Sequence, residues 1–238
     1  MLFSAHHLSK CYLAGTPGCS AAARVLSRVS LDLPAGSVVG VSGSRGCGKT
    51  TLLRCVAGLA RPDAGAVRWA PGAERARIVS LAPAALPFET VLESLTRACA
   101  DPLVDADRLT SALAHLALDG LLARPQMALT TDERARLALA VGLATRHALL
   151  LLDGTADAVA ARARATVRDC LHRRAADGCA VLLTGRDAEA VEALASTTFR
   201  LRDGRLVTTA DGDGRTPAAR VAERPAPSTR PPIPPAIR

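Results

Sequence analysis

The chain has 238 residues, of which 49% are hydrophobic and 2% aromatic, and its formal net charge is +8. This length suits one large α/β domain or two closely joined subdomains. The positive charge comes from arginines scattered among acidic residues, without a dense basic block or interleaved aromatic residues, so no specific nucleic-acid partner is expected.

The first third of the chain predicts two half-buried strands followed by a strand–loop–helix unit. Residues 2–10 and 25–33 alternate apolar and polar side chains, which is typical of antiparallel strands with one buried face. An apolar run at 38–41 predicts the next strand, and the following helix is expected to start at Lys49 and stop at Gly58, a residue type that commonly ends helices. Two short strands and a loop are predicted after it, at 66–69, 78–81 and 82–87.

The rest of the chain alternates helical and apolar strand patterns. Residues 91–147 are helical in pattern, with helix starts expected near 105–107 and 130–133, where acidic and hydroxyl side chains can cap free N–H groups. Residues 149–153 predict a buried strand that ends in an aspartate. The remaining elements are a helix, a strand, a helix and a hairpin turn, at 156–176, 180–183, from about 187, and at 203–204. This alternation predicts an α/β fold with a mostly parallel core sheet.

We expect one domain over residues 1–210, with a helical subdomain at about 91–145. From residue 211 the composition shifts to Gly, Pro, Arg and Ser, which predicts a disordered tail over 211–238. The seven cysteines form no C-x-x-C pair and no histidine-paired metal spacing, so free thiols in a reducing cytoplasm are expected. The longest apolar runs, such as 148–152, are far too short to span a bilayer, and the first residues lack a signal segment.

The most specific motif lies between the strand at 38–41 and the helix that follows it. Its glycines allow a sharp turn that aims successive N–H groups, and the positive end of the helix, at one anion. This pattern, G-x-x-x-x-G-K-T, predicts a phosphate-binding loop, in which Lys49 reaches the β and γ phosphates of a nucleotide and the Thr50 hydroxyl binds Mg²⁺. The residues of the loop are Gly43, Ser44, Arg45, Gly46, Cys47, Gly48, Lys49, Thr50 and Thr51.

Asp153 closes the apolar run at 149–153. In α/β sheets ligands gather at the carboxyl ends of strands, so this carboxylate is expected beside Thr50, where it would help to hold Mg²⁺ and its waters. The alternative is an aspartate that caps the next helix.

In this order the motifs resemble those of the nucleotide-binding domain of the ATP-binding cassette (ABC) family. The resemblance covers about residues 2–209, with supporting segments at 8–12, 29–36, 43–51, 129–137 and 201–207. It implies a P-loop NTPase fold with an antiparallel β-subdomain and a helical subdomain, and ATP and Mg²⁺ as cofactors. It also implies a homo- or heterodimer with a second nucleotide-binding domain, and a transmembrane permease subunit that holds the protein at the inner face of the membrane. Tyr12 would stack on adenine, the alternative being an ordinary strand-end tyrosine.

The sequence departs from the family pattern at the groups that perform hydrolysis. The family glutamate after the strand aspartate is Gly154 here, and the family histidine that contacts the γ-phosphate is replaced by Gly185. A metal-linked glutamine expected around 81–84 is also missing. The signature, usually Leu-Ser-Gly-Gly-Gln, is replaced by Leu129, Thr130, Thr131, Asp132 and Glu133.

The resemblance and its departures together predict an ATP-binding transporter subunit that binds MgATP and hydrolyses it weakly or not at all. We assign no catalytic residue. One alternative is an active ATPase in which Glu133, Asp157 or Asp187 stands in for the missing glutamate. Another is a soluble ABC protein outside transport that acts on nucleic acid or ribosomes, although the long insertions or second cassette typical of such proteins are missing.

Overall fold

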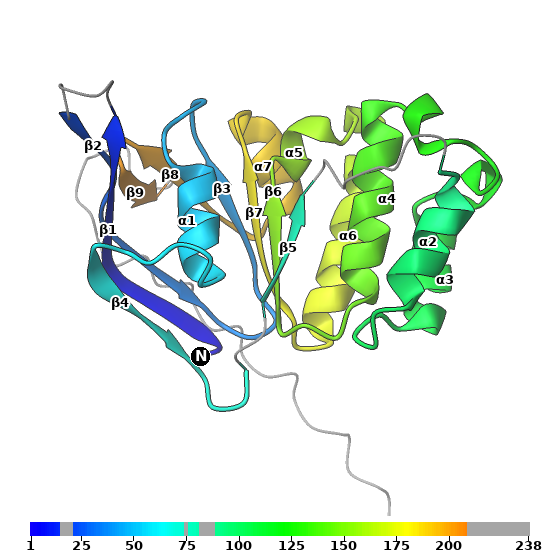
Figure 1. Cartoon of the computed structure of the whole chain (residues 1–238), viewed down its shortest axis with the longest axis horizontal. Coiled ribbons are helices and arrows are strands. Elements are labelled where there is room, and N and C mark those ends of the chain that lie inside the picture. Colours follow the sequence, from blue (N-terminus) through cyan, green and yellow to red (C-terminus); the bar gives the residue numbers. More distant parts are fainter. Residues whose placement is uncertain (15–20, 74–75, 81–88, 209–238) are drawn as a thin grey trace, which may run out of the picture.

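The computed structural model describes residues 1–14, 21–73, 76–80 and 89–208, and two β-sheets organise them (Figure 1). The expected tail over 211–238, the loop at 82–87 and the missing glutamine around 81–84 lie outside the described residues.

The smaller sheet is antiparallel and has three strands in the order β2-β1-β4. Its strands are longer than the alternating pattern predicted, because β1 and β2 stay paired as far as Ala14 opposite Ala21. The apolar residues of the alternation face inward, and the Phe3 ring packs edge-on against Trp69 at 4.8 Å. The bounds are β1 Phe3–Ala14, β2 Ala21–Leu33 and β4 Ala64–Trp69.

The larger sheet has six strands in the order β5-β6-β7-β3-β8-β9 and is parallel except for its last pair. This confirms the predicted mostly parallel core sheet. The hairpin between β8 and β9 turns at Asp203 and Gly204, both with positive φ, as two-residue hairpin turns require. The bounds are β5 Ala76–Ser80, β6 Leu149–Asp153, β7 Ala180–Gly185, β3 Val38–Ser42, β8 Thr197–Arg202 and β9 Arg205–Thr208.

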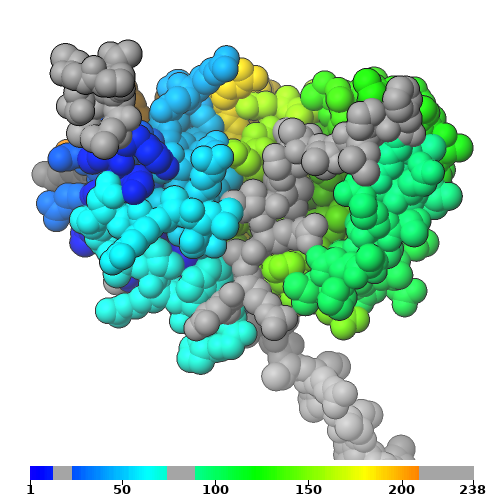
Figure 2. Space-filling model, viewed as in Figure 1, coloured from blue at the N-terminus to red at the C-terminus, as the bar shows by residue number. Residues whose placement is uncertain are grey.

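Helices cover both faces of the larger sheet (Figure 1). Helix α1 contacts β6 on the larger sheet and β2 on the smaller one. Helices α4, α6 and α7 pack on the opposite face, while α2 and α3 lie at the right-hand end of the molecule as viewed in Figure 1 and Figure 2. The bounds are α1 Lys49–Val56, α2 Val91–Cys99, α3 Ala106–His115, α4 Thr131–Ala144, α5 Thr155–Ala158, α6 Arg164–Ala176 and α7 Ala188–Leu194.

Two predicted helical stretches are interrupted. Between α3 and α4 the chain forms two 3₁₀ turns, Asp119–Leu121 and Gln126–Ala128. The expected helix at 156–176 is wrong as one element: α5 ends at Ala158, a 3₁₀ turn forms at Ala161–Ala163 and α6 begins after it. The break has a tertiary cause, because the Ala160 N–H donates to Asp132 Oδ1 of α4 at 2.8 Å instead of to its own helix.

The core lies on both faces of the larger sheet, and the strand alternation divides it. On the α1 side the buried strand residues include Val39, Val41, Leu149, Leu151 and Leu182. On the α4 and α6 side they include Val38, Leu150, Leu152, Val181 and Leu183. Because β3, β6 and β7 are parallel neighbours, their carboxyl ends meet at one edge, where the phosphate loop begins. None of the helices within the described ranges is both long and apolar enough to cross a membrane.

Candidate nucleotide-binding site

The phosphate loop connects β3, which ends at Ser42, to α1, which begins at Lys49. Gly46 has φ 80° and Gly48 has φ 110°, in the left-handed region that favours glycine. Gly48 also packs tightly, since an added Cβ would lie 2.8 Å from the backbone oxygen of Val25 on β2. The loop is therefore fixed against the smaller sheet, and its backbone geometry suits an anion at the start of α1.

Lys49 spans the loop from its helical side. Its Nζ donates to the Gly43 carbonyl at 2.6 Å and to the Ser44 carbonyl at 2.8 Å, and it lies 3.7 Å from Cys47 Sγ. The ammonium is thus held inside the loop by carbonyl groups that hold it without neutralising its charge. This is the place from which a lysine reaches the β and γ phosphates.

Thr50 and Asp153 meet beside the loop. The Thr50 hydroxyl donates to Asp153 Oδ2 at 2.8 Å, and the buried Thr184 hydroxyl donates to Oδ1 at 3.0 Å. Thr184 also accepts the N–H of Gly154 at 3.0 Å, so the end of β7 orients the carboxylate at the end of β6. The N-cap of α5 is Gly154 and has no side-chain cap, so Asp153 does not cap this helix.

The oxygens of Thr50 and Asp153 are ligands that Mg²⁺ accepts. Within the described ranges no group of three or more His, Cys, Asp or Glu side chains gathers as a metal site. A hydroxyl and one carboxylate leave most coordination positions to phosphate oxygens and water, which fits Mg²⁺ bound together with a nucleotide.

A pocket of about 360 Å³ opens over the loop. It combines six of the predicted loop residues, including the cationic Arg45 and Lys49, with Arg186 and with Tyr12, which is 41% exposed. Tyr12 also lies under Lys10, whose Nζ is 5.6 Å from the ring centroid. Stacking of Tyr12 on adenine stays a prediction. The lining residues are Tyr12, Val25, Arg45, Gly46, Gly48, Lys49, Thr50, Thr51, Gly154, Asp157 and Arg186.

Arg186 and Val25 are pocket residues that the sequence analysis missed. Arg186 comes directly after β7, so the rule that ligands gather at the carboxyl ends of parallel strands could have found it. No motif marks Val25, which reaches the pocket through the packing of β2 against the loop.

The three acidic residues considered as substitutes for the family glutamate lie in different surroundings. Asp157 lines the pocket, but its oxygens accept the backbone N–H of Arg186 at 2.7 and 2.9 Å and that of Asp187 at 3.1 Å. Asp187 caps α7 by accepting the Glu189 N–H at 3.0 Å. Glu133 belongs to α4, and neither it nor Asp187 lines the pocket.

The signature region forms the start of α4. Thr130 and Glu133 make a capping box, in which Thr130 Oγ1 accepts the Glu133 N–H at 3.2 Å and Glu133 Oε2 accepts the Thr130 N–H at 2.7 Å. These hydrogen bonds, the backbone one first, lower the pKa of Glu133. Asp132 pairs with Arg136, with 2.9 Å between Oδ2 and Nη2. The negative charges of Asp132 and Glu133 are therefore compensated within the chain, and no signature residue lines the pocket over the phosphate loop.

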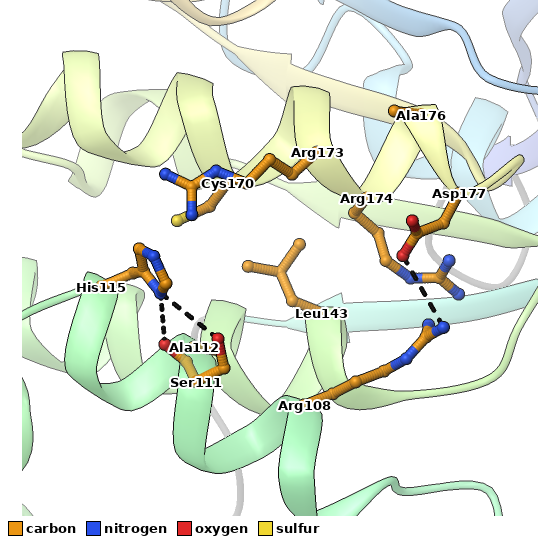
Figure 3. A pocket seen from close by; sticks show the side chains of 10 residues that line it. All are labelled: Arg108, Ser111, Ala112, His115, Leu143, Cys170, Arg173, Arg174, Ala176 and Asp177. Carbon is orange, nitrogen blue, oxygen red and sulfur yellow. Dashed lines mark hydrogen bonds and ion pairs between the residues drawn. The ribbon is translucent and has the colours of Figure 1, made fainter.

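A second cavity, of about 400 Å³, lies between α3, α4 and α6 and contains no predicted site residue (Figure 3). Two of its three arginines, Arg108 and Arg174, are engaged with the chain itself. Arg108 pairs with Asp177 at 3.7 Å, and Arg174 donates to the carbonyls of Thr145 and His147 at 2.9 and 3.0 Å. The His115 ring lies against the Ser111 carbonyl at 2.6 Å. Among the described residues, the predicted phosphate-loop residues therefore line the first pocket and not this second cavity.

Comparison with known proteins gives consistent matches. A family model described as ABC transporter matches residues 26–156. The aliphatic sulfonates import ATP-binding protein SsuB 1 of Rhizobium johnstonii is 35% identical over 199 residues, which cover 77% of this chain and 70% of the relative. The hemin import ATP-binding protein HmuV of Streptomyces coelicolor is 34% identical over 198 residues, which cover 76% of this chain and 71% of the relative.

Solved structures match the fold. The dimeric structure of MJ0796, a bacterial ABC transporter cassette, has a TM-score of 0.71 at 19% identity and covers 86% of this chain and 96% of that one. The structure of an ATP-binding subunit of an ABC transporter has a TM-score of 0.69 at 21% identity, with 88% and 90% covered.

Proposed function

The chain belongs to the ABC transporter family as an ATP-binding subunit, and from this premise we propose that it binds MgATP tightly and hydrolyses it slowly or not at all. It would couple nucleotide binding to a conformational change in a membrane-embedded permease. The cofactors are ATP and Mg²⁺, and the pocket over the phosphate loop is the place where they would bind.

The observation that carries this proposal is the Thr50–Asp153 contact at 2.8 Å next to Gly154. Thr50 and Asp153 would hold Mg²⁺, which supplies charge neutralisation between the β and γ phosphates when bound. Lys49 would hold the phosphates themselves. The residue directly after Asp153 is Gly154, which has no carboxylate. The Asp157 oxygens already accept hydrogen bonds from the backbone N–H groups of residues 186 and 187. Loss of a general base lowers the rate of hydrolysis by about 10²–10⁴-fold. The site would therefore keep its nucleotide binding while its hydrolysis is slow.

We further infer a permease partner and a second nucleotide-binding domain. The relatives named above are import ATP-binding proteins, one matching structure is a dimer, and another matching chain is described as part of the ABC transporter complex cbiONQ. A permease would hold this chain at the cytoplasmic face of the membrane. The cargo does not follow from these similarities, because relatives at 33–35% identity are named for sulfonates, sulfate or thiosulfate, and hemin.

The test compares equilibrium binding with turnover on the purified full chain, alone and with a co-expressed permease. Wild-type protein is expected to bind MgATP, and Lys49→Ala to lose binding, while steady-state phosphate release stays near background in both. Arg54→Ala, which changes an exposed arginine of α1 outside the pocket, serves as the matched control. Turnover of several per second on the chain alone that Lys49→Ala abolishes would contradict the proposed slow hydrolysis.

The pocket position of Asp157 favours one competing candidate, an ATPase in which this carboxylate activates water. It predicts that Asp157→Asn removes turnover while MgATP affinity remains. Our proposal predicts no turnover to remove, so the same assay separates the two.

A further inference from the structure

Arg186 directly follows β7 and lines the same pocket as the loop residues Arg45 and Lys49. Its side chain is 64% exposed, so a ligand in the pocket can reach it. Because Mg²⁺-bound nucleotide still carries negative charge on its terminal phosphate, an exposed guanidinium beside the loop can bind that phosphate.

Asp157 fixes the direction of this arginine. Its carboxylate accepts the Arg186 backbone N–H at 2.7 and 2.9 Å and the Arg186 Nε–H at 3.2 Å. Within the described part of the chain neither Nη nitrogen of Arg186 has a protein partner, which leaves four N–H donors for a ligand. The ion pair therefore orients the guanidinium and still leaves its phosphate-binding edge available.

At the carboxyl end of β7, the last strand residue, Gly185, has no room for a side chain, so residue 186 is the first that can carry one. A Cβ on Gly185 would lie 2.8 Å from Val191 Cγ2 and 2.9 Å from Ala156 Cβ, closer than real Cβ contacts. The Gly185 carbonyl accepts the Gly43 N–H at 3.2 Å, which ties this segment to the start of the phosphate loop. A charge supplied from the end of β7 has to come from Arg186.

The position of Arg186 in the pocket indicates which phosphate it would contact. Tyr12 and Val25 come from the smaller sheet, whereas Gly154, Asp157 and Arg186 follow β6 and β7 of the larger sheet, with α1 between the two sheets (Figure 1). The loop would hold the inner phosphates. The Thr50–Asp153 pair at the end of β6 (the metal corner) would lie next to the bond between the β and γ phosphates.

We propose that the Arg186 guanidinium, oriented by Asp157, binds the terminal phosphate of a nucleoside triphosphate and makes the site select triphosphate over diphosphate. The inference rests on the proposed nucleotide-binding function and names the residue that determines its specificity. Arginine keeps its charge at all physiological pH values, so the Arg186 charge itself does not titrate in this range.

The test is isothermal titration of the full chain with MgATP and MgADP. Arg186→Ala is expected to weaken MgATP binding by about 10- to 100-fold, the range for a lost charge-assisted contact, and to leave MgADP binding unchanged. Asp157 keeps its backbone donors in this variant, so the fold is retained. Equal losses for both nucleotides, or no loss for either, would overturn the inference. Arg54→Ala is expected to change neither affinity.

A pH series adds a readout that a purely structural role would not move. The ATP-to-ADP affinity ratio of Arg186→His, divided by that of wild type at the same pH to cancel titration of the nucleotide phosphates, is expected to rise toward low pH, following an imidazole pKa of about 6.5. A divided ratio that stays flat from about pH 5.5 to 8 would overturn the inference. If wild-type protein binds neither nucleotide, the proposed function itself fails; if it binds both and Arg186→Ala behaves as wild type, only this inference fails.

Discussion

Replacing Thr184 with valine should destabilise the fold and the metal corner together. The side chain is fully buried, and valine keeps its shape while removing the hydroxyl. That hydroxyl donates to Asp153 Oδ1 at 3.0 Å and accepts the Gly154 N–H at 3.0 Å. The substitution leaves one backbone donor and one carboxylate oxygen without their partner. An unsatisfied group of this kind costs about 1–3 kcal/mol, and we expect the free energy of unfolding to fall by that amount.

A neighbouring threonine provides the matched control. Thr155 is 1% exposed, but its Oγ1 has no hydrogen-bond partner among the residues that the structure describes. Thr155→Val therefore removes a buried hydroxyl that makes no bond. Because burial of an unpaired hydroxyl is itself unfavourable, this variant should be as stable as wild type or more stable, by up to about 1 kcal/mol.

Urea unfolding followed by far-ultraviolet circular dichroism measures both variants, and titration of ATP at several Mg²⁺ concentrations follows the metal corner. Thr184→Val should also raise the Mg²⁺ concentration needed for ATP binding, since the Asp153 carboxylate loses the contact that orients it. Equal unfolding midpoints for the two valine variants would refute the reasoning, because they would show that volume and not hydrogen bonding sets the stability here.

Three further predictions concern the signature helix and the thiols. Thr90→Ala and Thr130→Ala each remove a capping box and should each cost about 0.5–2 kcal/mol of unfolding free energy. Only Thr130 belongs to the signature region, which in the proposed dimer would contact the nucleotide of the second nucleotide-binding domain, so only Thr130→Ala should also weaken ATP-dependent association in sedimentation velocity. The pKa of Glu133 is lowered on folding by the Thr130 N–H and hydroxyl, so its stabilisation is present above its unfolded value near 4.5 and is lost as the pH falls through its folded value; the difference in urea midpoint between wild type and Glu133→Gln should therefore shrink at acid pH. MgATP should slow iodoacetamide labelling of the partly exposed Cys47, whereas Cys179, whose thiol pKa burial raises, should label slowly with or without nucleotide, as residue-specific mass spectrometry can show.

The parts of the site that could be predicted are those that local sequence determines. The loop at 43–51 requires glycines at fixed intervals because of its own backbone angles, so the motif itself carries the geometry. Asp153 could be placed because four consecutive leucines predict a buried strand, and ligands collect where such strands end. In both cases the information lies within ten residues.

The parts that could not be predicted depend on contacts between distant segments. The break before α6 comes from a hydrogen bond between Ala160 and Asp132, which are 28 positions apart. The ion pair between Asp132 and Arg136 could not be predicted for another reason. The two residues have the i, i+4 spacing of a helical ion pair, but this spacing brings them together only because α4 begins at Thr131, directly after its Thr130 cap. Arg186 is different, because its position directly after β7 follows the strand-end rule that placed Asp153, and the sequence analysis did not apply the rule there.

The backbone and the packing constrain the glycines at the two positions where the family has its hydrolytic groups, which bears on the proposed preference for binding over hydrolysis. Gly154 has φ 68°, and a side chain in this left-handed region costs about 1–2 kcal/mol, so a glutamate placed there would pay strain before it could act. Gly185 has ordinary φ but no room, since Val191 and Ala156 would both contact an added Cβ. Recovery of the family groups therefore requires movement of β7 against α5 and α7, not two substitutions. The Thr50–Asp153 corner sits on the same strand ends and would be disturbed by that movement. We infer that the packing which keeps the metal corner in place also excludes the family glutamate at residue 154 and the family histidine at residue 185.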